Sequence, residues 1–142
     1  MILPVSHENQ HEWAILNHEL WPDSTIIDAL IDREAGKLPN EFLYYVGDKA
    51  VAFISLSIRH DYVEGMESSP VGYLEGIYVK HGYRKQGIAS KLVSFAKEWF
   101  VSQGCIQLAS DCELDNENSR LFHKKVGFEE TNRIICFIMD IK

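Results

Sequence analysis

The middle of the chain joins a long apolar segment to an amphipathic segment through a short basic turn. Residues 71–79 are mostly β-branched, aromatic or aliphatic, which predicts a strand. Beyond Gly87, apolar residues recur at helical spacing for about 15 residues. A helix that starts there presents unpaired N–H groups and a partial positive charge, and the glycine leaves room for an anion. The pattern fits a phosphate-binding turn, although an ordinary strand–helix connection has the same pattern.

Charged residues are unevenly distributed around this turn. Residues 61–79 contain four acidic side chains and no Lys or Arg, whereas residues 80–97 contain five Lys or Arg and no acid. Residues 111–117 again contain four acids. Positive charge thus gathers where a phosphate would bind, and negative charge gathers on both sides of it. This distribution favours an enzyme that joins an anionic cofactor to a cationic substrate.

Length and composition restrict the class of protein. The 142 residues suffice for one domain over residues 1–142 with its own core. A net charge of −7 disfavours duplex nucleic acid or an anionic membrane surface as the main partner, and no apolar stretch approaches the roughly 20 residues of a membrane span. Three cysteines without a C-x-x-C pair, and no signal-peptide pattern, indicate a cytoplasmic protein with reduced thiols.

The order of periodic segments predicts the fold class. We expect helices over about residues 7–20, from Asp23 or Ser24 to Gly36, from Gly87 to Gly104, and over residues 116–126. We expect strands over residues 42–46, 50–58, 71–79 and 106–112, and one or two more over residues 128–141. This order indicates an α/β (α+β) fold, with a central mixed, partly parallel twisted sheet flanked by about four helices. His7 and His11 have the spacing of a zinc pair, but no third ligand completes it, so no metal is expected.

Two motifs resemble those of the GNAT acetyltransferase superfamily. Residues 74–79 followed by Tyr83–Ala89 are similar to its acetyl-CoA motif, and Asp115–Ser119 with Phe122, Lys125, Gly127 and Phe128 resembles its second motif. A finer resemblance is to the aminoglycoside 6'-N-acetyltransferases. It rests on Leu20–Pro22, Arg59–Gly65, Ser69–Val71, Ala109–Asp111 and Phe128–Thr131.

The resemblance implies acetyl-CoA as co-substrate, bound between two splayed strands. Its pantetheine arm would pair with the main chain of Ile77 and Val79, and its pyrophosphate would meet the turn before the long helix. A backbone N–H near Tyr78 or Val79 would stabilise the oxyanion. The full set of expected cofactor-binding residues is Ile77, Tyr78, Val79, Arg84, Lys85, Gln86, Gly87, Ile88, Ala89, Asn116, Ser119, His123 and Lys124.

The same resemblance implies where a polycationic aminoglycoside binds and how it reacts. It places Trp21, Tyr62, Glu75, Asp111 and Glu130 around the substrate. The 6'-amine would attack the thioester directly, with Asp111 or Glu75 as the catalytic group that accepts its proton. His123 stands where many relatives have a tyrosine, and we expect it to lie near the cofactor without being essential.

The resemblance also implies a homodimer, in which Tyr62 would reach either its own site or that of the partner. Two alternatives to aminoglycoside acetylation remain open at this point. The chain could acetylate another cationic amine (a polyamine, a lysine side chain or a protein N-terminus), since a fold does not fix the substrate. It could also be a binding module that keeps an acetyl-CoA pocket without turnover.

Overall fold

The computed structural model describes residues 1–37 and 40–142. In chain order its elements are β1 (Ile2–Pro4), α1 (Gln10–Leu20), α2 (Ile26–Glu34), β2 (Asn40–Val46), β3 (Lys49–Arg59), β4 (Val71–Val79), a 3-10 turn (His81–Tyr83), α3 (Ile88–Ser102), β5 (Leu108–Ser110) and α4 (Glu117–Lys125). The five strands form one sheet in the order β1-β2-β3-β4-β5, antiparallel except for the parallel pair β4–β5. The predicted mixed sheet with its helices is confirmed.

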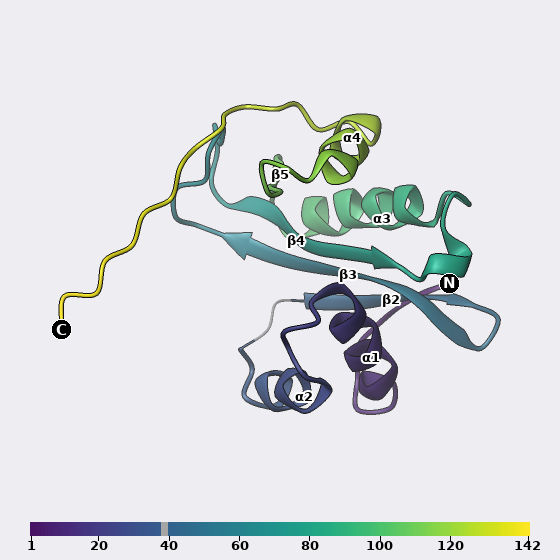
Figure 1. Ribbon diagram of the computed structural model, residues 1–142. Helices are drawn as coiled ribbons and strands as arrows, with labels where there is room; N and C mark the ends of the chain where they lie inside the picture. Colours follow the sequence, from purple (N-terminus) through teal and green to yellow (C-terminus); the bar gives the residue numbers. More distant parts are fainter. Residues whose placement is uncertain (38–39) are drawn as a thin grey trace.

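Helices cover both faces of the sheet, with α1 and α2 on one side and α3 and α4 on the other (Figure 1). One core cluster packs Leu92, Ala96 and Phe100 of α3 against the sheet, and another packs Trp13 and Leu16 of α1 against it. This explains why residues 50–56 of β3 form an unbroken buried run, because a central strand covered on both faces has no solvent side.

The first two helices begin later than their expected starts. Asn9 accepts a hydrogen bond from the Ser6 N–H at 2.7 Å, and α1 begins only at Gln10, so residues 7–9 are not helical. The second helix is capped by Thr25, whose hydroxyl accepts from the Asp28 N–H at 3.0 Å. The expected start at Asp23 or Ser24 was wrong, because Thr25 has the extended backbone and the spacing that an N-cap requires, and the helix begins after it.

The strands expected over residues 128–141 do not form, and the strand expected over residues 106–112 is reduced to Leu108–Ser110. The last residues run along the loop between β3 and β4, where the Asn132 amide donates to Glu64 at 3.2 Å, and then leave the body of the molecule (Figure 1). Ile138 is 97% exposed. The apolar pattern of this tail favours a strand, but a strand also needs a neighbour, and the described part of the chain provides none there.

No helix among the described residues is long and apolar enough to cross a membrane.

Candidate active site

The parallel strands β4 and β5 pair over three residues and then separate. Gly72, Tyr73 and Leu74 face Leu108, Ala109 and Ser110, and the pairing ends there. Beyond Leu74, β4 continues to Val79 and pairs with β3 on its other edge, as in the pairs Ile54–Ile77 and Ala52–Val79. The edge of β4 that faced β5 has no further strand partner among the described residues. An extended ligand with amide groups can pair with such an edge as an added strand would.

The turn that follows β4 leaves a helix end open. Lys85 (φ 63°) and Gly87 (φ 81°) both have left-handed backbone, and Gly87 is the N-cap of α3 without a side-chain cap. A Cβ added at Gly87 would meet nothing within 4 Å. The Ile88 side chain is buried in the core, so only its backbone faces the turn. The Arg84 Nε donates to the Val79 carbonyl at 2.8 Å, which holds its guanidinium beside the same opening. Backbone N–H groups, a helix dipole and a cation therefore converge where an anion fits.

Three expected cofactor residues on α4 are held by hydrogen bonds. The Asn116 side chain accepts from the Ser119 N–H at 3.1 Å and caps α4. The His123 ring lies within hydrogen-bond distance of the Ser119 carbonyl (Nδ1, 2.7 Å) and of the Ser110 hydroxyl (Nε2, 2.8 Å). Ser110 is the last paired residue of β5, so these contacts fix α4 beside the opening. Lys124 is exposed on the same helix.

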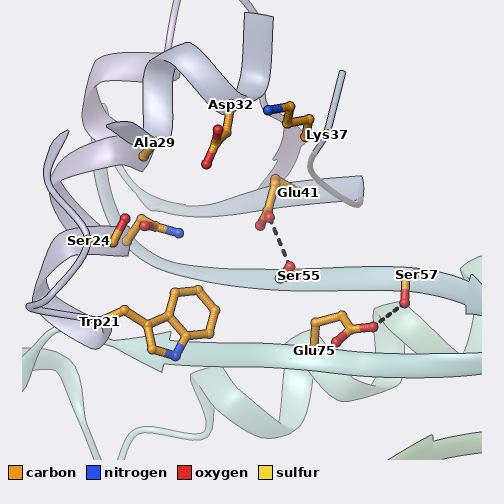
Figure 2. Close-up of a pocket in the computed structure, with 10 residues that line it drawn as sticks. Trp21, Ser24, Ala29, Asp32, Lys37, Glu41, Ser55, Ser57 and Glu75 are labelled. Carbon is orange, nitrogen blue, oxygen red and sulfur yellow. Dashed lines mark hydrogen bonds between the residues drawn. The ribbon is translucent and has the colours of Figure 1, made fainter. Parts of the chain in front are cut away.

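A cavity of about 580 Å³ lies on the other face of the sheet, between α1, α2 and the middle of strands β2, β3 and β4 (Figure 2). It is lined by Asn17, Trp21, Ser24, Ala29, Asp32, Lys37, Glu41, Ser55, Ser57 and Glu75. Trp21 packs tightly on Gly76, where an added Cβ would come within 2.5 Å of the indole ring. Only a glycine at this strand position lets the indole close that side of the cavity.

Glu75 and Asp111 are connected through two residues that the sequence interpretation did not single out. The Arg59 guanidinium donates to Glu75 from Nη2 at 2.8 Å and from Nε at 3.2 Å, and the Ser57 hydroxyl donates to the same carboxylate. Arg59 also stacks on Tyr73, 3.5 Å from the ring centroid. The Tyr73 hydroxyl in turn donates to Asp111. Burial and the nearby Asp111 carboxylate raise the pKa of Tyr73, so it remains a hydrogen-bond donor at neutral pH.

Period-2 alternation brings this network together. Residues 57 and 59 of β3 share a face, as do residues 73 and 75 of β4, and the register pairs Ser57 with Tyr73. The alternation of polar side chains in two adjacent strands could therefore have indicated this network. Predicting the contacts also requires the register between the strands, which cannot be read from the sequence.

Glu41 is a further residue that the sequence interpretation missed. Burial raises the pKa of this carboxyl to about 8. The Ser55 hydroxyl donates to its Oε1 at 2.8 Å (Figure 2). Hydrogen bonding by the neighbouring Trp13 indole lowers this pKa, and the Trp13 Nε1 and the Glu41 Oε2 are both buried without any other partner in the described part of the chain.

The structure brings together only some of the expected substrate residues. Trp21 and Glu75 line the cavity, and Asp111 is joined to Glu75 through Tyr73 and Arg59. Tyr62 is 74% exposed on the loop between β3 and β4. Glu130 lies in the tail and accepts from Arg133 at 2.6 Å, a contact that lowers the pKa of the Glu130 carboxyl. Neither Tyr62 nor Glu130 lines the cavity, and their substrate roles stay predictions.

The described residues contain no group of three or more His, Cys, Asp or Glu arranged to hold a metal ion.

Comparisons with known proteins agree across nearly the whole chain. Residues 6–128 match the model of the "Acetyltransferase (GNAT) family". The chain is 38% identical to an aminoglycoside N(6')-acetyltransferase type 1 of Acinetobacter haemolyticus, covering 96% of this chain and 95% of that protein. A protein of the same name from Serratia marcescens is also 38% identical, with 96% and 97% covered.

Solved structures of similar proteins agree with these sequence comparisons. The apo aminoglycoside 6'-N-acetyltransferase AAC(6')-IG of Acinetobacter haemolyticus superposes with a TM-score of 0.92 at 36% identity, covering 100% of this chain and 99% of that one. The structure of AAC(6')-Iy in complex with the bisubstrate analog CoA-S-monomethyl-acetylneamine also reaches 0.92, at 34% identity, with 99% and 97% covered.

Proposed function

The chain belongs to the acetyltransferase (GNAT) family, and we propose that it transfers the acetyl group of acetyl-CoA to the 6'-amine of aminoglycosides, which would confer resistance to them. One observation carries the proposal. Strand β4 leads at its end into an open helix terminus suited to phosphate, and its middle residue Glu75 lines an acidic, aromatic cavity suited to a polycation. The relatives that match this chain over nearly its whole length bear the name of that activity.

The binding groups for acetyl-CoA lie along β4 and the turn after it. The N–H groups of residues 86–89 and the Arg84 guanidinium bind the pyrophosphate, and Lys85 and Lys124 add positive charge. The main chain of Ile77 and Val79 pairs with the pantetheine amides along the free edge of β4. When bound, acetyl-CoA supplies the acetyl thioester. A backbone N–H near Tyr78 or Val79 is aimed at the developing oxyanion.

The two carboxylates near the reacting amine are suited to different tasks. An aliphatic amine is mostly protonated at neutral pH, so it must lose a proton before it attacks the thioester. Arg59 offsets the charge of Glu75, which suits that residue to orienting the amine. Asp111 is exposed and accepts a hydrogen bond from the neutral Tyr73 hydroxyl, which suits it to take up the amine proton, directly or through water. Both tasks add to the rate that comes from holding the two reactants together.

His123 is not needed as an acid in this scheme. Its ring nitrogens already face the Ser119 carbonyl and the Ser110 hydroxyl. A thiolate is a good leaving group and departs without a proton donor, so we assign His123 to fixing α4 beside the cofactor.

A thiol-release assay tests the activity. Purified protein is given acetyl-CoA with tobramycin or kanamycin, with spermidine, or with a lysine-containing peptide. We expect turnover with the two drugs, and none with an aminoglycoside that carries a 6'-hydroxyl in place of the amine. Turnover only with spermidine or the peptide would move the substrate to another amine, and acetyl-CoA binding without any turnover would favour a binding module.

We also propose a homodimer, which the C-terminal tail supports. Phe137, Ile138 and Met139 are 81–97% exposed, and β5 has an unpaired edge among the described residues. Apolar side chains in such a row mark a contact surface, and a second copy of the chain can cover them by strand addition. We place the protein in the cytoplasm because its three cysteines include no C-x-x-C pair, a pattern that fits reduced thiols better than a disulfide framework.

Light scattering tests the dimer. We expect twice the chain mass of 16.3 kDa for the intact protein and a single chain mass after deletion of residues 134–142. A monomeric intact protein at micromolar concentration would contradict the dimer and leave the proposed activity standing.

A further inference from the structure

The backbone places Glu75 at a β-bulge in the middle of β4. The register pairs Ser55 of β3 with Gly76. The next residue of β3, Leu56, pairs with Leu74, so Glu75 is left out of the pairing. A bulge of this kind re-aims one side chain and is common beside active sites. The Glu75 side chain lines the cavity on the side of the sheet that α1 and α2 cover (Figure 2).

The two oxygens of the Glu75 carboxylate have different numbers of donors. Oε2 accepts from the Ser57 hydroxyl and from the Arg59 guanidinium, at 3.2 Å from Nε and 2.8 Å from Nη2. Among the described residues, Oε1 accepts only from the Arg59 Nη2, at 3.0 Å. Because a carboxylate oxygen has two lone-pair positions, Oε1 can accept one more donor. The carboxylate thus keeps one position for an N–H group of a ligand.

The Arg59 guanidinium is held from two sides. In the register Arg59 lies opposite Val71, four residues before Glu75, so its side chain extends along the sheet to reach the carboxylate. On the way it crosses Tyr73, where the guanidinium carbon lies 3.5 Å from the ring centroid. The Tyr73 hydroxyl donates to Asp111. One fixed cation therefore contacts Glu75 and lies one tyrosine ring away from Asp111.

The other charged groups near the cavity do not take over this role. Burial raises the pKa of Glu41 on β2 to about 8, so that carboxyl is neutral at pH 7. Asp32 of α2 and Lys37 after it line the cavity with opposite charges. From α4, the His123 ring contacts the end of β5. In the part of the chain that the structure describes, Arg59 is thus the cation paired with a carboxylate of the proposed amine site.

We propose that Arg59 is a positioning residue for acetyl transfer, which fixes Glu75 so that Oε1 receives the substrate amine and offsets the carboxylate charge so that the bound ammonium can give its proton to Asp111. The inference rests on the proposed function and deepens it, because it explains how a site acidic enough to bind an ammonium also produces the neutral amine that reacts.

The charge balance around the amine decides how readily it loses its proton. An ammonium between two uncompensated carboxylates keeps its proton firmly, since opposite charges favour the charged form. A fixed guanidinium nearby has the opposite effect, because like charges disfavour that form. With Arg59 in place, the nitrogen gives one proton to Asp111, directly or through water, and keeps the lone pair that attacks the thioester carbon.

The pH profile of a single turnover measures this effect. Enzyme in excess over acetyl-CoA is mixed with saturating tobramycin between about pH 6 and about pH 9.5, so product release does not limit the rate. The rate rises as the bound amine loses its proton. For Arg59→Met we expect the midpoint of this rise to move up by about one pH unit, and the rate below the midpoint to fall about tenfold. The KM for tobramycin should stay at or below the wild-type value, because the site becomes more acidic. Arg59→Lys keeps the charge and should restore the midpoint.

A double-variant cycle keeps the test decisive if Arg59→Met alone folds poorly, as circular dichroism would show. Glu75→Gln leaves Arg59 unpaired and should move the midpoint down by about one pH unit, although its rate is low at every pH. Arg59→Met combined with Glu75→Gln removes both charges, so the midpoint should return to within about 0.3 pH units of wild type. Lys97→Met is the matched control, because it removes an exposed cation from α3 on the other face of the sheet, and it should keep the wild-type profile.

The outcomes separate this inference from the proposed activity. A wild-type midpoint in Arg59→Met, together with a raised KM for tobramycin, would identify a merely structural ion pair and overturn the inference. A midpoint that does not return in the double variant would also overturn it. Both results leave aminoglycoside acetylation by the wild type intact. A wild-type protein that acetylates no aminoglycoside would overturn the proposed function and this inference with it.

Discussion

The two proposed binding sites, one for acetyl-CoA and one for the aminoglycoside, are built in different ways along β4. At the end of β4 the anion site consists of backbone groups, a glycine and an arginine within one short turn. Along the middle of β4 the cavity consists of side chains from β2, β3, β4 and the two N-terminal helices. The turn after β4 is formed by residues close together in sequence, so substitutions elsewhere in the chain should leave it intact. The cavity depends on register and packing, so single changes there alter charge balance and substrate binding together.

The largest effect is expected from removing the two carboxylates that we propose contact the reacting amine. Glu75→Gln and Asp111→Asn should each lower kcat/KM for tobramycin by about 100-fold or more, since general acid–base groups contribute on that scale. The affinity for acetyl-CoA, measured by calorimetry, should be unchanged, because the anion turn is separate. Unchanged kcat/KM in both variants would remove these two assignments.

A complementary test alters the turn after β4 and leaves the cavity unchanged. Gly87→Val places a β-branched residue at φ 81° and puts methyl groups into the anion opening. The KM for acetyl-CoA should rise about tenfold or more while the KM for tobramycin stays within threefold. Gly47→Val is the matched control, since Gly47 also has a left-handed φ of 62° and its Cβ would meet nothing within 4 Å. An equal rise in both variants would show that strain alone, rather than the anion site, explains the change.

The free energy of unfolding should depend on pH because the Glu41 carboxyl is buried. Its pKa is raised from 4.5 to about 8, so the folded protein holds a proton that the unfolded chain releases between these values. Wild type should therefore lose stability as pH rises from about 4.5 to 8, and Glu41→Gln should not. The gap in unfolding free energy between the two proteins should grow by a few kcal/mol over that range. Urea denaturation at pH 5, 6, 7 and 8 measures it, and a constant gap would contradict the buried carboxyl.

The smallest effect is expected at His123. Because thiolate departs without an acid, His123→Ala should keep kcat within about tenfold of wild type, the low end for a lost acid–base group. The residual loss reflects the missing contacts to Ser110 and Ser119. A thousandfold fall in kcat, with a shifted pH profile, would instead identify His123 as the proton donor.

Much of the fold could be predicted because its signals are local. The apolar run of β4, the periodicity of α3 and the glycine between them are each readable within about 30 residues, and all three form as expected. The helix caps were harder, since Ser24 and Thr25 are both good N-cap residues and only backbone conformation distinguishes them. The tail was mispredicted because a run of apolar and β-branched residues favours a strand wherever it occurs, whereas pairing requires a neighbour in space.

Residue type and nearby spacing alone predicted the strand–turn–helix unit around Gly87 and the sheet class, whereas Glu75 and Asp111 came from the family resemblance of the sequence and stay a prediction. Only the tertiary structure decided that Arg59 and Tyr73 connect those two carboxylates, and that Glu41 is buried beside Ser55 and Trp13. The reason is physical. The state of a carboxyl depends on the charges and solvent around it, and the register between β2, β3 and β4 sets both.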